Sequence, residues 1–112
     1  MVCLGNICRS PLAEGIMQHK IDEHGLDWQV ASAGTGNWHI GEPPDDHSVA
    51  VARDRGLDIT HQRARQFRPY DFEEFDRIYA MDAGNYRDIL KHAEDDKERD
   101  KVRMILNEVY PG

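Results

Sequence analysis

Nine residues near the start of the chain carry the residue types that a phosphate site needs: Cys3-Leu4-Gly5-Asn6-Ile7-Cys8-Arg9-Ser10-Pro11. A cysteine attacks as its thiolate, and nearby cations and helix N-termini favour that form. Arg9 carries a planar guanidinium that can bind two phosphate oxygens at once. Ser10 suits an N-cap and Pro11 the first helical position, so a helix is expected to start there and to point its free N–H groups into the loop. The stretch therefore predicts a nucleophile beside an anion cradle.

The expected phosphate-binding loop comprises Leu4, Gly5, Asn6, Ile7, Cys8 and Arg9. Gly5 and Asn6 tolerate the backbone angles of a tight turn, and successive N–H groups in such a turn form a concave anion site. We expect Cys3 to attack phosphorus while Arg9 and the loop amides hold the equatorial oxygens. Ser10 is expected to hydrogen-bond the sulfur. The predicted catalytic residues are thus Cys3, Arg9 and Ser10.

This nine-residue string resembles the active-site signature of the low-molecular-weight protein tyrosine phosphatases. Three later stretches resemble further blocks of that family, in order and over nearly the whole chain: Ser32 to Gly36 with Trp38 and Gly41 to Pro44, His61 to Gln66, and Phe75 to Asp82 with Asn85, Arg87 and Asp88. The resemblance implies hydrolysis of phosphotyrosine through a cysteinyl-phosphate intermediate, without a metal or other cofactor. The implied partners are phosphotyrosine-containing proteins or peptides and inorganic phosphate or a similar oxyanion.

The resemblance also implies a substrate groove lined by Ile7, Trp38 and His39. Trp38 matches an aromatic position that lines the entrance for a phenolic ring; its alternative role is packing. Ile7 favours an aryl phosphate, because a related group that acts on phosphoarginine carries threonine at this position. Phosphoarginine hydrolysis is therefore a less favoured alternative. Arsenate reduction on the same fold is disfavoured too, because it needs further cysteines downstream and none follows Cys8.

Three residues are implied as supports of the loop: Asn6, Ser32 and His61. For His61 the alternative is an exposed polar side chain. Cys8 is implied as a redox partner, whose disulfide with Cys3 would shelter the nucleophile from irreversible oxidation. Its alternative role is a small residue packed under the loop.

One part of the family pattern is missing from this sequence. The family's general acid is an aspartate in an Asp-Pro pair near the C-terminus, and this sequence contains no Asp-Pro pair. General acid catalysis typically contributes ~10²–10⁴-fold. Asp71, Asp76 and Asp82 are candidates for the role by residue type alone. We expect a phosphatase shortened at both ends; the alternative is a non-catalytic or crippled phosphotyrosine-binding module. The family's final helix is absent from this sequence as well, which would leave apolar surface exposed and favour a homodimer.

The composition fits one domain over residues 1–112. A net charge of −7 argues against partners bound by bulk positive charge, namely nucleic acids and anionic membranes. No apolar run approaches the ~20 residues of a membrane span, and no signal peptide precedes Cys3. With two cysteines and no export signal, the sequence indicates a reducing cytoplasm.

Strands alternating with helices predict a three-layer α/β/α fold with a four-stranded parallel sheet, and the phosphate loop at the carboxyl end of the first strand. The expected strands span residues 1–4, 28–33, 75–81 and 102–106. The expected helices span 11–24, closed by Gly25, about 45–55, closed by Gly56, and 82–93, capped by Asp82. A short helical turn is expected from residue 69, a charged connection at 94–101 and a final turn at 111–112.

Overall fold

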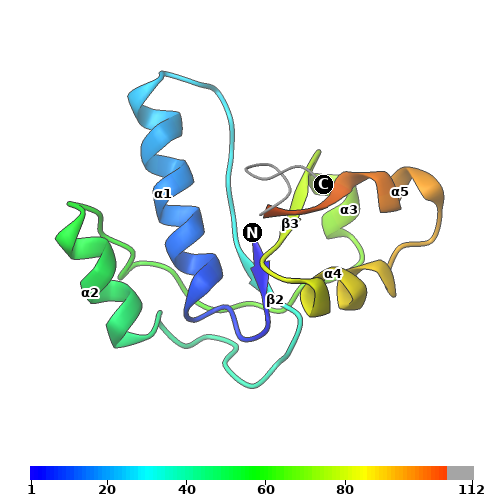
Figure 1. Cartoon of the computed structure of the whole chain (residues 1–112), viewed down its shortest axis with the longest axis horizontal. Helices are drawn as coiled ribbons and strands as arrows, with labels where there is room; N and C mark the ends of the chain where they lie inside the picture. The colour runs from blue at the N-terminus through cyan, green and yellow to red at the C-terminus, as the bar shows by residue number, and fades with distance from the viewer. Residues whose placement is uncertain (106–112) are drawn as a thin grey trace.

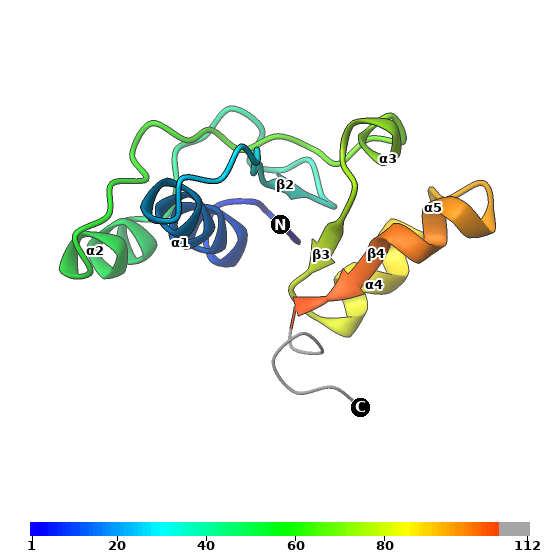
Figure 2. The same cartoon turned by 90° about the horizontal axis from the view of Figure 1, so that it is seen from above.

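The computed structural model describes residues 1–105 and shows four parallel strands between two layers of helices (Figures 1 and 2). The sheet order is β2-β1-β3-β4, with the strands β1 (Val2–Cys3), β2 (Ala33–Gly34), β3 (Ile78–Ala80) and β4 (Val102–Met104). The helices are α1 (Arg9–Glu23), α2 (Asp46–Asp54), α3 (Asp71–Glu74), α4 (Ala83–Leu90) and α5 (Asp96–Lys101). The all-parallel sheet confirms the predicted fold class.

Helices lie on both sides of the sheet, with α1 and α2 on one side and α3 and α4 on the other (Figure 2). Strand side chains alternate between the two faces, and those on the α4 side form an apolar core. That core joins residues of β1, β3 and β4 to α3 and α4, among them Val2, Ile78, Val102, Phe72 and Ile89. β1 is an inner strand of the sheet, and Cys3 is its last residue. Cys3 therefore lies at the carboxyl edge of the sheet, where α/β proteins bind ligands.

Local signals in the sequence explain where the helices begin and end. The Asp45 carboxylate accepts from the His47 amide and caps α2; the sequence left Asp45 and Asp46 as alternatives for this cap. Gly25 and Gly56 follow α1 and α2 with φ of 64° and 76°. At each, paired bonds back into the last turn close the helix, as Leu26 N to Ile21 O at 3.0 Å does for α1. Both glycine stops were predicted.

Several expected elements were wrong in extent or type. The strands expected at 1–4 and 75–81 are reduced to the two residues of β1 and the three of β3. The strand expected at 28–33 is reduced to Ala33–Gly34, because β1 offers only two residues for pairing. The charged connection expected at 94–101 contains α5, whose N-cap Asp95 accepts from Glu98 N at 2.8 Å. No residue of α5 is buried, so this helix leaves no apolar periodicity in the sequence. The end of the fourth expected strand and the turn at 111–112 lie outside the described residues.

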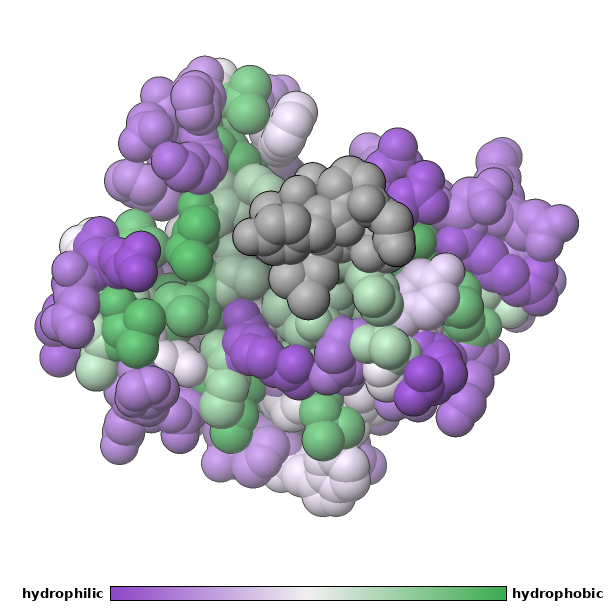
Figure 3. Space-filling model, viewed as in Figure 1, coloured by the Kyte–Doolittle hydropathy of each residue, from purple (hydrophilic) through white to green (hydrophobic). Residues whose placement is uncertain are grey.

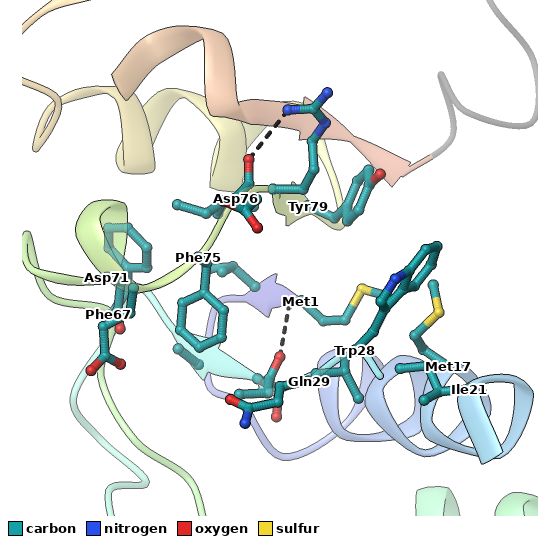
Figure 4. Close-up of a pocket in the computed structure, with 18 of the residues that line it drawn as sticks. Met1, Met17, Ile21, Trp28, Gln29, Phe67, Asp71, Phe75, Asp76 and Tyr79 are labelled. Carbon is teal, nitrogen blue, oxygen red and sulfur yellow. Dashed lines mark hydrogen bonds between the residues drawn. The ribbon is translucent and has the colours of Figure 1, made fainter. Parts of the chain in front are cut away.

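The surface combines charged and apolar regions. Figure 3 shows hydrophilic side chains over α5 and hydrophobic ones gathered where α1 and α2 meet. A hollow of about 710 Å³ lies beside the amino ends of β1 and β3. Figure 4 shows Met17, Ile21 and Trp28 on one side of it and Phe67 and Phe75 on the other, around Met1. The expected homodimer stays a prediction. Among residues 1–105, no helix is long and apolar enough to cross a membrane.

Candidate active site

The segment between β1 and α1 forms the candidate site, and it is tied to the rest of the sheet by backbone bonds. Cys3 is only 3% exposed at the end of β1. Its carbonyl accepts from Thr35 N at 2.9 Å, and the Leu4 carbonyl accepts from Gly36 N at 2.8 Å. These bonds join the loop to the chain that follows β2. The loop is therefore anchored on its outer side before any ligand binds.

Close packing at Gly34 holds the loop from beneath. A Cβ on Gly34 would meet the Leu4 carbonyl oxygen at 2.8 Å, Gly5 carbon at 3.0 Å and Asn6 nitrogen at 3.1 Å. All three neighbours are backbone atoms, so they have little freedom to move aside. Only a glycine lets β2 approach the loop this closely. Sequence reasoning did not assign Gly34 this role, although it lies in the second family block.

Asn6 is the centre of the hydrogen-bond network inside the loop. Its φ is 58°, a left-handed conformation that asparagine tolerates better than most residues. Its side-chain Nδ2 donates to Ser10 Oγ at 2.8 Å and to Ser32 Oγ at 2.9 Å, while its Oδ1 accepts from Arg65 N at 3.0 Å. Asn6 is 2% exposed. The structure thus brings Asn6 and Ser32 together, and their role as supports of the loop stays a prediction.

The sulfur of Cys3 receives two contacts from this network. Ser10 Oγ lies 3.0 Å from Cys3 Sγ, and Asn6 N donates to the same sulfur at 3.3 Å. Ser10 is fully buried. The expectation that Ser10 caps the helix is wrong, because α1 starts at Arg9 and its N-cap is Cys8, without a side-chain cap bond. The Ser10 hydroxyl is used at the sulfur instead.

Arg9 opens α1 and reaches across the loop to Asp82. Its Nη1 donates to Asp82 Oδ2 at 3.0 Å, while Asp82 Oδ1 accepts from Asn85 N at 2.8 Å and so caps α4. The bond from the Asn85 amide and the bond from Arg9 lower the pKa of Asp82 below its ordinary value. The cap was predicted, but the contact with Arg9 was not. The position of Asp82 just after β3 could have indicated it, since neighbouring parallel strands end at the same edge.

The expected groove residues surround the mouth of the loop. Trp38 is 68% exposed, and its ring lies over Gly36, where an added Cβ would come within 2.1 Å of the ring. His39 packs against Gly5, with its Cδ2 2.9 Å from the position of an added Cβ, and its Nδ1 lies 2.7 Å from Glu42 Oε2. Ile7 is half-buried on the loop itself. An exposed aromatic ring and two loop neighbours could thus flank a bound aryl group.

His61 does not fill the support role that was expected of it. Its side chain is exposed, and no hydrogen bond from it to the loop is found in residues 1–105. The neighbouring Gln62 is 8% exposed and donates from Nε2 to Pro11 O at 3.1 Å. Gln62 therefore supports the start of α1. The alternation of exposed and buried residues in this segment, which sequence reasoning did not resolve, places the glutamine inside.

Cys8 is exposed and, like Cys3, a free thiol. Partial burial, followed by the Asp45 carboxylate and Cys3, raises the pKa of Cys8 above its ordinary value. Its carbonyl accepts from Ser48 Oγ at 3.2 Å, which joins the loop to α2. The alternative of Cys8 packed under the loop does not fit this exposure. Its role as redox partner of Cys3 stays a prediction.

None of the three candidate aspartates stands free beside Cys3. The Asp71 side chain is 2% exposed and pairs with Arg65 at 3.1 Å. Asp82 is engaged by Arg9 and by the amino end of α4. Asp76 is exposed and lines the hollow beside the amino ends of the strands, away from the loop (Figure 4). In the part of the chain that the structure describes, no group of three or more His, Cys, Asp or Glu could hold a metal ion.

This parallel α/β fold brings a thiol, a backbone loop, an arginine and a helix N-terminus together at one sheet edge, an arrangement suited to an anionic ligand. Residues 1–110 match the family model described as low molecular weight phosphotyrosine protein phosphatase, and the chain belongs to this family.

Two kinds of comparison support the assignment. A low molecular weight phosphotyrosine protein phosphatase of Schizosaccharomyces pombe is 39% identical over 114 aligned positions, covering 99% of this chain and 72% of that protein. The crystal structure of YfkJ from Bacillus subtilis superposes with a TM-score of 0.92 at 38% identity, covering 99% of this chain and 70% of that one. A protein tyrosine phosphatase from Entamoeba histolytica with Hepes in its active site gives 0.90 at 36% identity, covering 95% and 68%. Of eight curated relatives compared, the chain spans 52% to 72% of their lengths.

Proposed function

We propose that this chain takes a phosphoryl group from an aryl phosphate, phosphotyrosine among them, onto Cys3 Sγ and then passes it to water. The observation that carries the proposal is the pair of contacts at the sulfur, from Ser10 Oγ at 3.0 Å and Asn6 N at 3.3 Å. Hydrogen bonds to sulfur stabilise the thiolate over the thiol, and the thiolate is the nucleophile.

In the first step, the phosphate would bind to the loop N–H groups, the amino end of α1 and Arg9. The Arg9 guanidinium has five N–H donors, and Asp82 occupies Nη1, so the other donors remain for phosphate oxygens. Cys3 Sγ then attacks phosphorus, the P–O bond to the aryl group breaks, and the phenolate leaves with the bonding electron pair. The fixed donors stabilise the charge on the equatorial oxygens without rearranging.

In the second step, water attacks the phosphorus of the cysteinyl phosphate and the P–S bond breaks. The electron pair returns to sulfur, and inorganic phosphate is released with the proton balance completed by solvent. Ser10 Oγ lies where it can donate to the sulfur as negative charge returns to it. The same hydroxyl would thus assist both steps.

This mechanism includes no acid that protonates the leaving group from within residues 1–105. A phenolate leaves faster when a carboxylic acid protonates it, and the three candidate aspartates are engaged elsewhere or distant. We therefore propose that aryl phosphates with acidic phenols react quickly and that phosphotyrosine reacts slowly. The second candidate, a phosphotyrosine-binding module that holds its ligand without turnover, is favoured by this same observation.

Relatives bear on the ligand class. The structure of Wzb from Vibrio vulnificus was determined in complex with benzylphosphonate, which carries a phenyl ring. The Drosophila arginine phosphatase also superposes, with a TM-score of 0.85 at 34% identity. We keep aryl phosphate as the proposed substrate because Ile7 and the exposed Trp38 flank the loop. The proposal includes a reducing cytoplasmic setting, where Cys3 and Cys8 would stay free thiols.

The test is a leaving-group series of aryl phosphates, assayed in rapid-mixing experiments without metal for the parent and for Cys3→Ser. The proposal expects a burst of phenol stoichiometric with the parent protein, and rates that rise steeply with the acidity of the phenol. Cys3→Ser should show neither. Tight phosphopeptide binding with no burst for any phenol would instead support the binding module. Faster release from phosphoarginine than from phosphotyrosine would overturn the aryl preference.

A further inference from the structure

An ion pair between a half-buried arginine, Arg65, and a buried carboxylate, Asp71, lies behind the Asn6 network, and the mechanism above does not use it. Arg65 Nη1 lies 3.2 Å from Asp71 Oδ1 and 3.1 Å from Asp71 Oδ2. Asp71 Oδ2 also accepts from Arg68 N at 2.9 Å. The aspartate side chain is 2% exposed and the arginine side chain 36%. A buried carboxylate costs free energy unless it is paired and hydrogen-bonded, so its position here needs an explanation.

The link to the nucleophile runs through the main chain of Arg65. Its N–H donates to Asn6 Oδ1 at 3.0 Å, and its carbonyl accepts from Gly34 N at 2.8 Å. A backbone N–H can only donate, so the atom of Asn6 that faces Arg65 must be the oxygen. The Asn6 Nδ2 must then face the two serines and donate to both.

The orientation of the Asn6 amide fixes which atom donates the hydrogen bond between Ser10 Oγ and Cys3 Sγ. Ser10 Oγ accepts from Asn6 Nδ2, which leaves its own hydrogen available for Cys3 Sγ at 3.0 Å. If the Asn6 amide were turned over, its oxygen would face Ser10, and the hydroxyl would donate to the amide instead of the sulfur. The orientation of one amide thus decides whether Ser10 stabilises a thiolate.

We propose that Arg65 and Asp71 are positioning residues that set the orientation of the Asn6 amide, and through it the hydrogen bond from Ser10 to the Cys3 thiolate. The carboxylate of Asp71 holds the Arg65 side chain and the Arg68 amide together, and so fixes the short segment whose first N–H meets Asn6. Neither residue touches the reacting atoms. The inference rests on the proposed use of Cys3 as a thiolate nucleophile, but it can be tested without turnover.

The experiment measures alkylation of Cys3 by iodoacetamide as a function of pH, in a Cys8→Ser background so that a single thiol is followed. Asp71→Asn keeps the shape and an acceptor for Arg68 N but removes the charge. Arg65→Met keeps the apolar stem and the backbone N–H. We expect both changes to move the pH midpoint of alkylation upward by about one unit, a tenfold loss of thiolate below the midpoint. Turnover of an aryl phosphate should lose kcat, with KM changed less.

The matched control is the exposed pair Arg99 and Asp96 of α5, joined at 2.8 Å. Arg99→Met and Asp96→Asn should leave the alkylation profile where it is. Circular dichroism and thermal unfolding show whether each variant is folded. Folded Asp71→Asn and Arg65→Met proteins with the parent midpoint would overturn the proposal. Loss of folding in both would also overturn it, because the pair would then be a folding element. A parent with a low midpoint and no turnover would reject the proposed function alone.

Discussion

Arg9 and Asp82 meet across the mouth of the loop, with Nη1 3.0 Å from Oδ2, and Asp82 uses its other oxygen to cap α4. Both side chains are about half exposed, at 52% and 46%. An exposed pair of this kind contributes ~0–1 kcal/mol to stability. Its greater effect is on the guanidinium itself, which it holds at one orientation beside the loop.

Asp82→Asn should therefore reduce activity more than stability. The asparagine can still accept from Asn85 N, so α4 keeps its cap, but the charged partner of Arg9 is lost. We expect a several-fold fall in kcat/KM for an aryl phosphate and almost no change in Tm. The conservative change Arg9→Lys should be far more damaging, because an ammonium cannot reproduce the fork. A variant Asp82→Asn with undiminished or raised kcat/KM would show that Asp82 competes with phosphate for Arg9.

Gly34→Ala should disturb the site through packing alone. The added Cβ would lie 2.8 Å from Leu4 O, and the backbone of β2 or of the loop must then shift. We expect a loss of phosphate affinity, measured by calorimetry, with a lower Tm. Gly56→Ala, at the end of α2, is the control: its Cβ would meet nothing within 4 Å, and its φ of 76° costs stability without touching the loop. Unchanged phosphate binding by Gly34→Ala would mean that the loop is not held from beneath.

Asn6 combines a strained backbone with a hydrogen-bonding side chain, and two substitutions separate these effects. Asn6→Gly removes the side-chain bonds but suits a φ of 58°. Asn6→Ala removes the same bonds and keeps a Cβ at that φ, at an added cost of ~1–2 kcal/mol. Urea unfolding should rank the parent above Asn6→Gly, and Asn6→Gly above Asn6→Ala. Equal stability of the two variants would show that the left-handed conformation carries no strain here.

The amino group of Met1 predicts a pH dependence of stability. Its burial lowers its pKa from 8.0 to about 6, so the unfolded chain binds more protons between these values. The free energy of unfolding should therefore rise as the pH is raised from about 6 to 8, by no more than about 3 kcal/mol. Urea unfolding across this range checks it, with Nα-acetylated protein as the control because acetylation leaves the histidines unchanged. The same rise in the acetylated protein would assign it to other groups.

Much of the fold could be read from the sequence because each signal was local. Four residues mark the ends of helices through hydrogen bonds to residues within a few positions: Asp45, Asp82, Gly25 and Gly56. Helix α5 was missed because its residues are solvated and leave no apolar pattern. The short β2 was overextended because pairing depends on the length of β1, a partner far away in the sequence.

The residues of the site likewise divide into those that the local sequence indicates and those whose contacts depend on the fold. Cys3, Arg9 and the loop between them form one contiguous motif, so the residue types of the nine-residue string pointed to them. The contacts that depend on folding were not foreseen: Asp82 against Arg9, and Arg65 N against Asn6 Oδ1. His61 and Gln62 show this limit most clearly, because the family resemblance pointed to the histidine while the backbone turns the glutamine inward.

The central claim is that Cys3 becomes phosphorylated, and the covalent intermediate can be measured directly. The parent and Cys3→Ser proteins would be mixed with an aryl phosphate that has an acidic phenol, quenched in acid within the burst, digested, and analysed by mass spectrometry. The account predicts one added phosphoryl group on the peptide that contains Cys3 in the parent, and none in Cys3→Ser. Phenol release by the parent without phosphate on Cys3, or equal release by Cys3→Ser, would contradict it.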